Sequence, residues 1–275
     1  MKKVFFIILL CLSLFMFAAC SDNNNEVSNV DTLPVTDAPQ ADIPAEDTQP
    51  AQDPVDESKD DVSSPDEFIA VDTDNGFYVT EYTGNAKKLI VPDEIDGKTV
   101  VGIKAGFYPE NDFEEIVLPA GLLKIEKGMF MFNANLKKVT FNDGLKEIGI
   151  DAFYGCSGLT EIEIPASVEV IHGKAFGSCE NLNKVTLNEG LKKVGYSSFA
   201  GTAVETFVFP ESVEVVEDKV ISVCPNIKEV KFLSKNTDVD KNAIKDCMDF
   251  TVYGYAGSAA EQMAVYNNYA FVAIE

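Results

Sequence analysis

The chain has 275 residues, of which 45 are acidic and 22 basic, and its formal net charge is −23. It contains no arginine and a single histidine. This composition argues against nucleic acid as a partner, because binding phosphates requires clustered basic side chains. It also leaves no second histidine for a metal site, and we expect neither a metal nor a cofactor.

The N-terminus has the pattern of an export signal. Lys2 and Lys3 precede an apolar run that is short for a membrane-spanning helix and fits a signal-peptide core. The run ends in Phe17-Ala18-Ala19-Cys20, which resembles the lipobox of bacterial lipoproteins, although Phe17 stands where Leu is usual. The resemblance implies a signal peptide over 1–19 and lipid attachment at Cys20. The protein would then be exported and anchored to the bacterial cell membrane at the cell surface; the alternative is an ordinary secreted protein with an incidental cysteine.

The segment 20–67 begins with Cys20 and continues as an acidic stretch. Residues 21–67 contain six prolines, fourteen acidic residues and one basic residue, Lys59. Such a segment cannot bury enough apolar surface to offset its chain entropy, so we predict a disordered tether. Its main role would be to hold the following domain away from the membrane, and a specific partner for the tether is the alternative.

A repeat fills the rest of the chain, 68–275. The pattern L-x-x-I-x-L recurs, and its polar and apolar positions alternate as in a strand with one buried face. The units start at residues 113, 136, 159, 182, 204, 227 and 250. A second apolar column follows at Phe107, Phe130, Phe153, Phe176, Phe199, Ile221 and Ile244. Units that cannot bury their own apolar face must stack on neighbours, so the sequence predicts a repeat solenoid.

Both ends of the repeat region carry signals for caps. Asp74-Asn75-Gly76 lies between two short apolar stretches and predicts a hairpin turn. Ser258 and Glu261 form a capping-box pattern that opens a helix over 259–266, followed by a strand over 270–274. Solenoids need such caps against end-to-end association.

One unit carries a family resemblance. Residues 159–179 read L-x-x-I-x-L-P-x-x-L-x-x-I-x-x-x-A-F-x-x-C almost throughout, which resembles the BspA-like class of bacterial leucine-rich repeats. The units depart from this pattern at Val220-Ile221, which replaces Ala-Phe, and at Asn142 and Asn188, which replace Pro. The resemblance implies a right-handed leucine-rich-repeat stack of about seven 23-residue units over 68–275. It would have parallel β-strands, short turns or helical segments, an N-terminal hairpin cap and a C-terminal helix–strand cap.

Position three of successive strands alternates in charge. Opposite charges on neighbouring strands attract, so we expect a cross-strand ion pair at each of three steps. The column is either purely structural or also a strip for ligand contact. Its members are Glu115, Lys138, Glu161 and Lys184.

A second candidate contact surface is aromatic. Residues that follow the phenylalanine column would form an outward stripe near the N-terminal end, of a kind that contacts proteins or sugars. The alternative is that the N-terminal cap or a loop covers them. The stripe consists of Tyr108, Met131, Phe132 and Tyr154.

Four cysteines occupy one column of the repeat. Cys156, Cys179, Cys224 and Cys247 follow the repeat spacing and not the short spacing of zinc ligands. We predict buried thiols. Disulfides between Cys156 and Cys179, and between Cys224 and Cys247, are the alternative that export permits.

No catalytic motif is present in the sequence. His172 occupies a turn position, and there is no G-x-S-x-G, phosphate loop or H-E-x-x-H. A glycosidase needs two carboxylates across a cleft, and a stack of regular strands offers no such cleft. The family resemblance implies adhesion or recognition through an extracellular protein or glycan ligand, without a reaction. An envelope scaffolding lipoprotein and a carbohydrate-active enzyme are the alternatives.

Overall fold

A computed structural model describes residues 62–104 and 113–275. The predicted signal peptide, Cys20, most of the tether, Phe107 and Tyr108 lie outside these residues.

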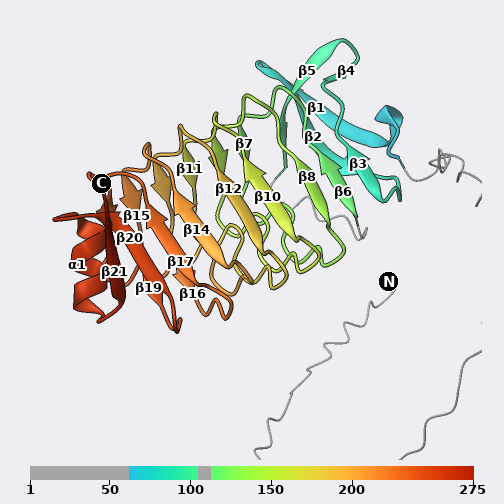
Figure 1. The fold of residues 1–275 in the computed structure, drawn as a ribbon. Coiled ribbons are helices and arrows are strands. Elements are labelled where there is room, and N and C mark those ends of the chain that lie inside the picture. The colour runs from blue at the N-terminus through green and yellow to red at the C-terminus, as the bar shows by residue number, and fades with distance from the viewer. Residues whose placement is uncertain (1–61, 105–112) are drawn as a thin grey trace, which may run out of the picture. The chain divides into compact units, whose positions relative to one another are not determined.

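The described residues form a stack of repeats, as predicted (Figure 1). Each unit contributes one strand to what we call the main strand face, and neighbouring strands are parallel. One further unit precedes the predicted series, because β3 pairs with β6. The strands of this face are β3 (Lys88–Ile90), β6 (Glu115–Val117), β8 (Lys138–Thr140), β10 (Glu161–Ile164), β12 (Lys184–Leu187), β14 (Thr206–Phe209), β17 (Glu229–Phe232), β20 (Thr251–Tyr255) and β21 (Ala270–Ile274).

A second parallel sheet, the short-strand sheet, lies later in each unit. Its strands pair continuously from β7 to β18. They are β7 (Lys124–Ile125), β9 (Glu147–Ile148), β11 (Val170–Ile171), β13 (Lys193–Val194), β15 (Val215–Val216) and β18 (Asp238–Val239). A further pair, β16 (Ile221–Ser222) and β19 (Ile244–Lys245), forms where isoleucines replace the column phenylalanines.

The phenylalanine column fills the core between these sheets. The rings of Phe153, Phe176 and Phe199 lie parallel, with centroids 5.3 Å apart at each step, and all three side chains are fully buried. Ile221 and Ile244 continue the column and are also buried. The predicted shared interior is therefore confirmed for the described residues.

The predicted N-terminal hairpin is present. β1 (Phe68–Thr73) and β2 (Gly76–Tyr82) pair in antiparallel fashion, and the turn ends at Gly76, whose φ of 136° suits glycine. The hairpin belongs to a sheet of order β1-β2-β5-β4, with β5 at Lys98–Ile103 and β4 at Glu94–Ile95. A short 3-10 helix, η2 (Pro65–Glu67), precedes it.

The C-terminal helix and strand are present at the predicted bounds. α1 (Ala259–Tyr266) begins after Ser258, whose Oγ accepts the N–H of Glu261 at 3.3 Å. The Glu261 carboxylate accepts the N–H of Gly257 at 2.6 Å. β21 then pairs with β20 in parallel register.

Ion pairs link neighbouring units across the short-strand sheet. The Glu169 carboxylate lies 2.6 Å from Nζ of Lys192 and 3.4 Å from Nζ of Lys146. The hydrogen bond from Lys192, and then that from Lys146, lowers the pKa of the Glu169 carboxyl below its ordinary value. The side chains are exposed, so each pair adds little to stability by itself.

Replacing Phe176 by Ala should destabilise the stack by about 3–5 kcal/mol, because it opens a cavity between two rings. Urea unfolding followed by circular dichroism measures the loss. The matched control is Phe132→Ala, since this ring is 64% exposed and its removal should cost about 1 kcal/mol or less. Equal losses in the two variants would contradict a core column.

Replacing Glu169 by Gln should make stability less sensitive to acid. A carboxylate whose folded pKa is depressed stabilises above its unfolded pKa of about 4.3, and this contribution is lost as pH falls through the folded value. Melting temperatures of wild type and variant should therefore differ near neutral pH and converge in acid, once the pH has fallen below the folded pKa of Glu169. Glu180→Gln is the control, since the described residues give Glu180 no ion pair; a constant gap between wild type and Glu169→Gln at all pH values would refute the linkage.

Candidate functional site

The charged column lies on the main strand face, in the predicted register. Glu115 and Lys138 face each other on β6 and β8, with their charged atoms 3.2 Å apart. Glu161 and Lys184 do so on β10 and β12, also at 3.2 Å. The cross-strand attraction is present at these two steps, and a ligand role for the column stays a prediction.

The middle step of the column differs from the prediction. β8 and β10 do not pair, and Lys138 and Glu161 form no ion pair within 4.0 Å in the described part of the chain. The main strand face is divided into β3-β6-β8, β10-β12 and β14-β17-β20-β21. We call the gap between β8 and β10 the first break and that between β12 and β14 the second break. The short-strand sheet is continuous across the same units, so the units separate on one face only.

Backbone groups at the first break lack the partners that equivalent groups have elsewhere. At four of the intact steps, two successive N–H groups donate to one carbonyl of the preceding unit, as Lys137 and Lys138 do to Glu114. Thr160 and Glu161 stand at the same repeat positions, and among the described residues their N–H groups make no such bond. Unpaired strand edges are open to ligand groups that can hydrogen-bond.

The second break coincides with the one short repeat. The loop from Phe199 to Val204 is one residue shorter than the loop from Phe176 to Leu182. As a result Ala203 donates its N–H to the carbonyl of Leu182, at 2.9 Å, before β14 begins. The chain is thus shifted by this shorter loop immediately before the point where β12 and β14 separate.

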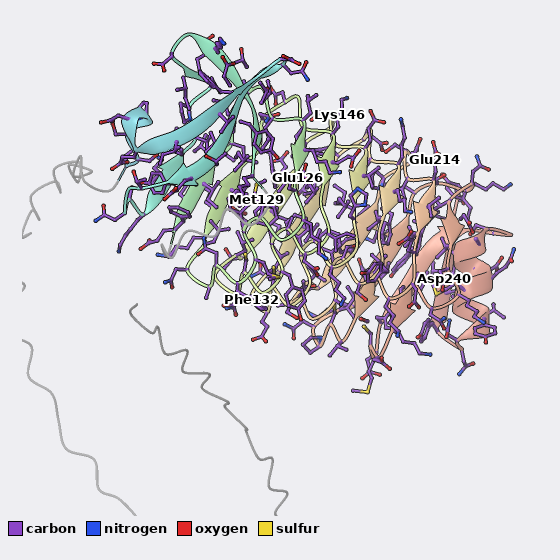
Figure 2. All side chains as sticks on the ribbon, turned by 180° about the vertical axis from the view of Figure 1, so that it is seen from behind. Glu126, Met129, Phe132, Lys146, Glu214 and Asp240 are labelled. Carbon is purple, nitrogen blue, oxygen red and sulfur yellow. The ribbon has the colours of Figure 1, made fainter. Side chains whose placement is uncertain are left out.

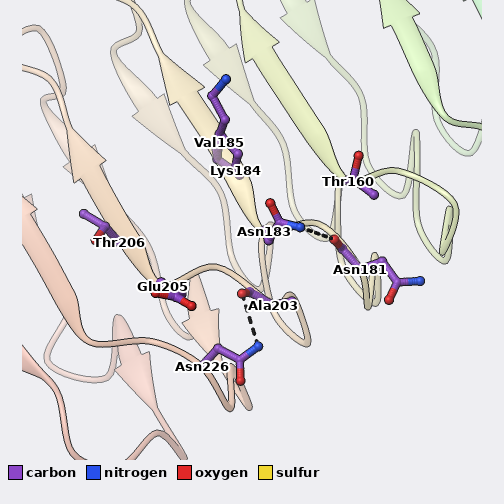
Figure 3. A pocket seen from close by; sticks show the side chains of 9 residues that line it. All are labelled: Thr160, Asn181, Asn183, Lys184, Val185, Ala203, Glu205, Thr206 and Asn226. Carbon is purple, nitrogen blue, oxygen red and sulfur yellow. Dashed lines mark hydrogen bonds between the residues drawn. The ribbon is translucent and has the colours of Figure 1, made fainter. Parts of the chain in front are cut away.

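Each break opens into a hollow. The first hollow, at the first break, has a volume of about 320 Å³, and the second hollow, at the second break, about 700 Å³ (Figure 3). Thr160 and Lys184 line both. Lys137, Lys138, Glu161, Glu163 and Thr186 also line the first, and Asn181, Asn183, Glu205, Thr206 and Asn226 also line the second.

The two hollows differ in chemistry. The first is lined mainly by lysine and glutamate, whereas the second is rich in amides. In the second hollow, Nδ2 of Asn183 donates to the Asn181 carbonyl at 3.3 Å and Nδ2 of Asn226 donates to the Ala203 carbonyl (Figure 3). These bonds hold the loops and leave the amide oxygens without a partner in the described region. Both hollows therefore suit polar ligands that hydrogen-bond.

Sequence reasoning did not identify the asparagines of the second hollow. It expected regular strands and hence no cleft, and the breaks overturn that expectation. A signal for the second break was present in the single 22-residue spacing between Leu182 and Val204. The first break has 23-residue spacing on both sides and carries no such signal.

Part of the aromatic stripe lies outward as predicted. The Phe132 ring is exposed and meets Tyr154 edge-to-face, with centroids 5.6 Å apart. Met131 is half-buried, and Tyr108 lies outside the described residues. Phe132 adopts a left-handed φ of 62° and its ring lies over Gly155, where a Cβ would come within 2.7 Å of it. Figure 2 shows Phe132 at the edge of the stack opposite Lys146 and Glu214. Neither Phe132 nor Tyr154 is among the residues that line the two hollows.

The cysteine column contains free thiols. Cys156 and Cys179 are fully buried and donate to the carbonyls of Phe130 and Phe153, at 3.1 and 3.2 Å. Burial raises the pKa of the Cys179 thiol to about 12, which keeps it protonated. These thiols are structural.

The single histidine also has a structural partner. His172 Nε2 lies 3.1 Å from the Glu147 carboxylate on the short-strand sheet. Residues 62–104 and 113–275 hold no group of three metal-ligating side chains. No helix within these residues is long and apolar enough to span a membrane.

Comparisons with known proteins agree with the repeat pattern. Residues 102–228 and 147–271 match the family described as BspA type leucine rich repeat region, in six copies. No curated protein matches the chain.

A solved structure shares the fold. The leucine-rich repeat protein of T. pallidum is 23% identical, with a TM-score of 0.62 over 76% of this chain and 97% of that one. A leucine-rich cell surface protein from Faecalibacterium prausnitzii A2-165 is 17% identical over 69% of this chain and 75% of that one, with a TM-score of 0.40. A leucine-rich repeat protein from Bacteroides ovatus ATCC 8483 is 17% identical over 68% and 70%, with a TM-score of 0.34.

The family match spans more than half of the chain and falls on the same units that form the stack. Proteins with these repeats are typically binding scaffolds of protein-binding or adhesion type at bacterial surfaces. By its sequence and its fold, this chain belongs to the BspA-type leucine-rich repeat family.

Proposed function

We propose that this protein is an exported, lipid-anchored recognition protein that binds an extracellular protein or glycan through the two hollows of the main strand face. The observation that carries the proposal is the pair of breaks in this face. They combine unpaired strand edges with charged and amide side chains on one surface. Lys184 and Thr160 line both hollows, so one ligand can engage the two together.

The proposed role is binding without turnover. The carboxylates nearest the hollows are held by neighbours: Glu161 by Lys184, Glu163 by the amide of Asn188, and Glu205 by Lys228 at 2.7 Å. A carboxylate already engaged by a neighbouring side chain is less available to exchange a proton with a bound ligand. The typical behaviour of the family as a binding scaffold supports the same conclusion.

Anchoring is proposed to occur through Cys20 after removal of 1–19. The acidic tether 21–67 would then separate the repeat stack from the membrane, since a charged chain of low hydrophobicity extends itself. The usual surface association of the family supports this placement.

Replacing Lys184 by Ala should weaken ligand binding about tenfold, because it removes a charge shared by both hollows. The ligand is first identified by screening the immobilised full chain against a glycan array and a panel of extracellular matrix proteins. Biolayer interferometry then compares the variants. Lys192→Ala is the matched control, since Lys192 makes the same kind of ion pair on the short-strand sheet. If both variants bind the ligand as wild type does, the hollows are not the site.

Replacing Cys20 by Ser should abolish lipid attachment and move the protein from the membrane fraction to the medium. Metabolic labelling with radioactive palmitate in a bacterial host, followed by fractionation, measures both effects. Cys11→Ser is the control, because Cys11 lies within the predicted signal peptide. Unchanged labelling of Cys20→Ser would show that the lipid is attached elsewhere.

A further inference from the structure

The C-terminal strand of the stack has a bare edge. β21 ends the sheet order β14-β17-β20-β21, and within the described residues no strand pairs with its other side (Figure 1). Its sequence, AFVAI, contains neither charge nor proline. Val272 is 46% exposed, and Val265 and Tyr266 at the end of α1 are 71% and 65% exposed. An uncharged edge strand that carries an exposed apolar side chain is a site for pairing with another strand.

The hydrogen-bond pattern between β17, β20 and β21 determines which backbone groups of β21 point away from the sheet. Thr251 donates its N–H toward β17, to the Lys228 carbonyl at 2.8 Å. Along a parallel strand, the N–H and C=O groups of successive residues point alternately to the two neighbouring strands. The backbone groups of Val252 and Gly254 therefore face β21, and those of Ala270, Val272 and Ile274 face β20. The N–H and C=O of Phe271 and Ala273 are therefore directed away from the sheet. They make no hydrogen bond in the described part of the chain.

The edge strands at the other end of the stack are protected. On the main strand face, Val62 forms an isolated parallel bridge with Lys88 of β3, and Ser63 donates its N–H to the Lys88 carbonyl at 3.0 Å. In the separate sheet of the hairpin, the edge strand is β1. β1 contains a bulge between Ile69 and Ala70, and Asp72 on the same strand pairs with Lys98. Bulges and charges are common means by which proteins prevent edge-to-edge pairing. β21 has neither a bulge nor a charge, so its edge remains open to pairing with another strand.

We propose that the edge of β21 is an interface with a second copy of this chain, formed by antiparallel pairing about a two-fold axis at Val272. This interface is additional to the proposed ligand site. The two-fold axis pairs the N–H and C=O of Phe271 with those of Ala273 in the second copy. It also sets Ala270 opposite Ile274, and Glu275 opposite Tyr269 and not opposite another acid. In an isologous interface the same surface of both copies must be complementary to itself, and the edge of β21 meets this requirement.

The same geometry has two consequences. It joins the main strand faces of two stacks into one sheet and places their N-terminal hairpins at opposite ends. It also brings together two repeat domains that each carry a net charge of −12 over residues 68–275. Salt screens that repulsion, so association should strengthen as ionic strength rises.

Sedimentation equilibrium of the full chain at two salt concentrations tests the interface. We expect a monomer–dimer equilibrium at concentrations on the order of tens of micromolar, shifted toward dimer by salt. Ala273→Pro removes an outward N–H without touching the ladder to β20 and should give a monomer, whereas Ala273→Ser keeps the N–H and should dimerise. Val272→Lys sets two cations against each other at the axis and should also give a monomer. Val71→Lys is the control, because Val71 is 54% exposed but lies on β1, and this variant should still dimerise.

Several outcomes would overturn the proposal. A full chain that stays monomeric at about 100 μM in high salt is one. A monomer in which hydrogen exchange finds the Phe271 and Ala273 amides protected would mean that another segment of the same chain covers the edge. Dimers that survive both Ala273→Pro and Val272→Lys would place the contact elsewhere, and long filaments would indicate head-to-tail association. Equal melting temperatures of the variants establish that they are folded.

Discussion

The constraint on which the structure depends is that a unit of about 23 residues cannot bury its own apolar side chains. Successive units supply a phenylalanine or an isoleucine to a shared column, and the centroids of the Phe153, Phe176 and Phe199 rings are 5.3 Å apart at each step. Every ring is thus covered by the units before and after it. The column ties the stability of each unit to its neighbours, and the spacing of the units follows from it.

This arrangement explains how the main strand face can be interrupted without loss of the stack. A backbone hydrogen bond contributes about 0.5–1.5 kcal/mol net, and a solvated strand edge recovers much of that from water. A buried phenylalanine contributes several times more. At both breaks the short-strand sheet remains continuous. Across the first break the rings of Phe153 and Phe176 stay stacked, and across the second break Phe199 contacts Phe207, with ring centroids 4.9 Å apart. The strand-to-strand hydrogen bonds on one face can therefore be given up. The surface that we propose for ligand binding is therefore the part of the unit that contributes least to the core.

The sequence predicted the features that apolar periodicity and local turn chemistry determine. The column, the hairpin at Gly76 and the helix Ala259–Tyr266 are confirmed, because each depends on residues within one unit or one turn. The breaks were not predicted, because an L-x-x-I-x-L pattern states which side chains face inward and not how far apart neighbouring strands lie. Lys138 and Glu161 have ideal charges for a pair and fail to meet for this reason. The asparagines of the second hollow were missed because their role depends on a gap that only the arrangement of two units reveals.

The ends of the stack follow from the same repeat logic. Inside a solenoid, each strand edge is covered by an identical unit, so an end is protected only where the chain departs from the repeat. At the N-terminus the chain reverses direction in the β1–β2 hairpin, which adds a bulge and a charge to the outer edge. At the C-terminus α1 packs where the short strand of the next unit would lie, and its buried Met263 and Ala264 cover the core. β21, however, keeps the parallel register of the preceding strands. The helix thus covers the apolar core at this end, but the outer edge of β21 keeps the backbone hydrogen-bonding groups of an internal strand. At the C-terminal end of the stack the core is therefore covered and the strand edge is not, whereas at the N-terminal end the edge is protected as well.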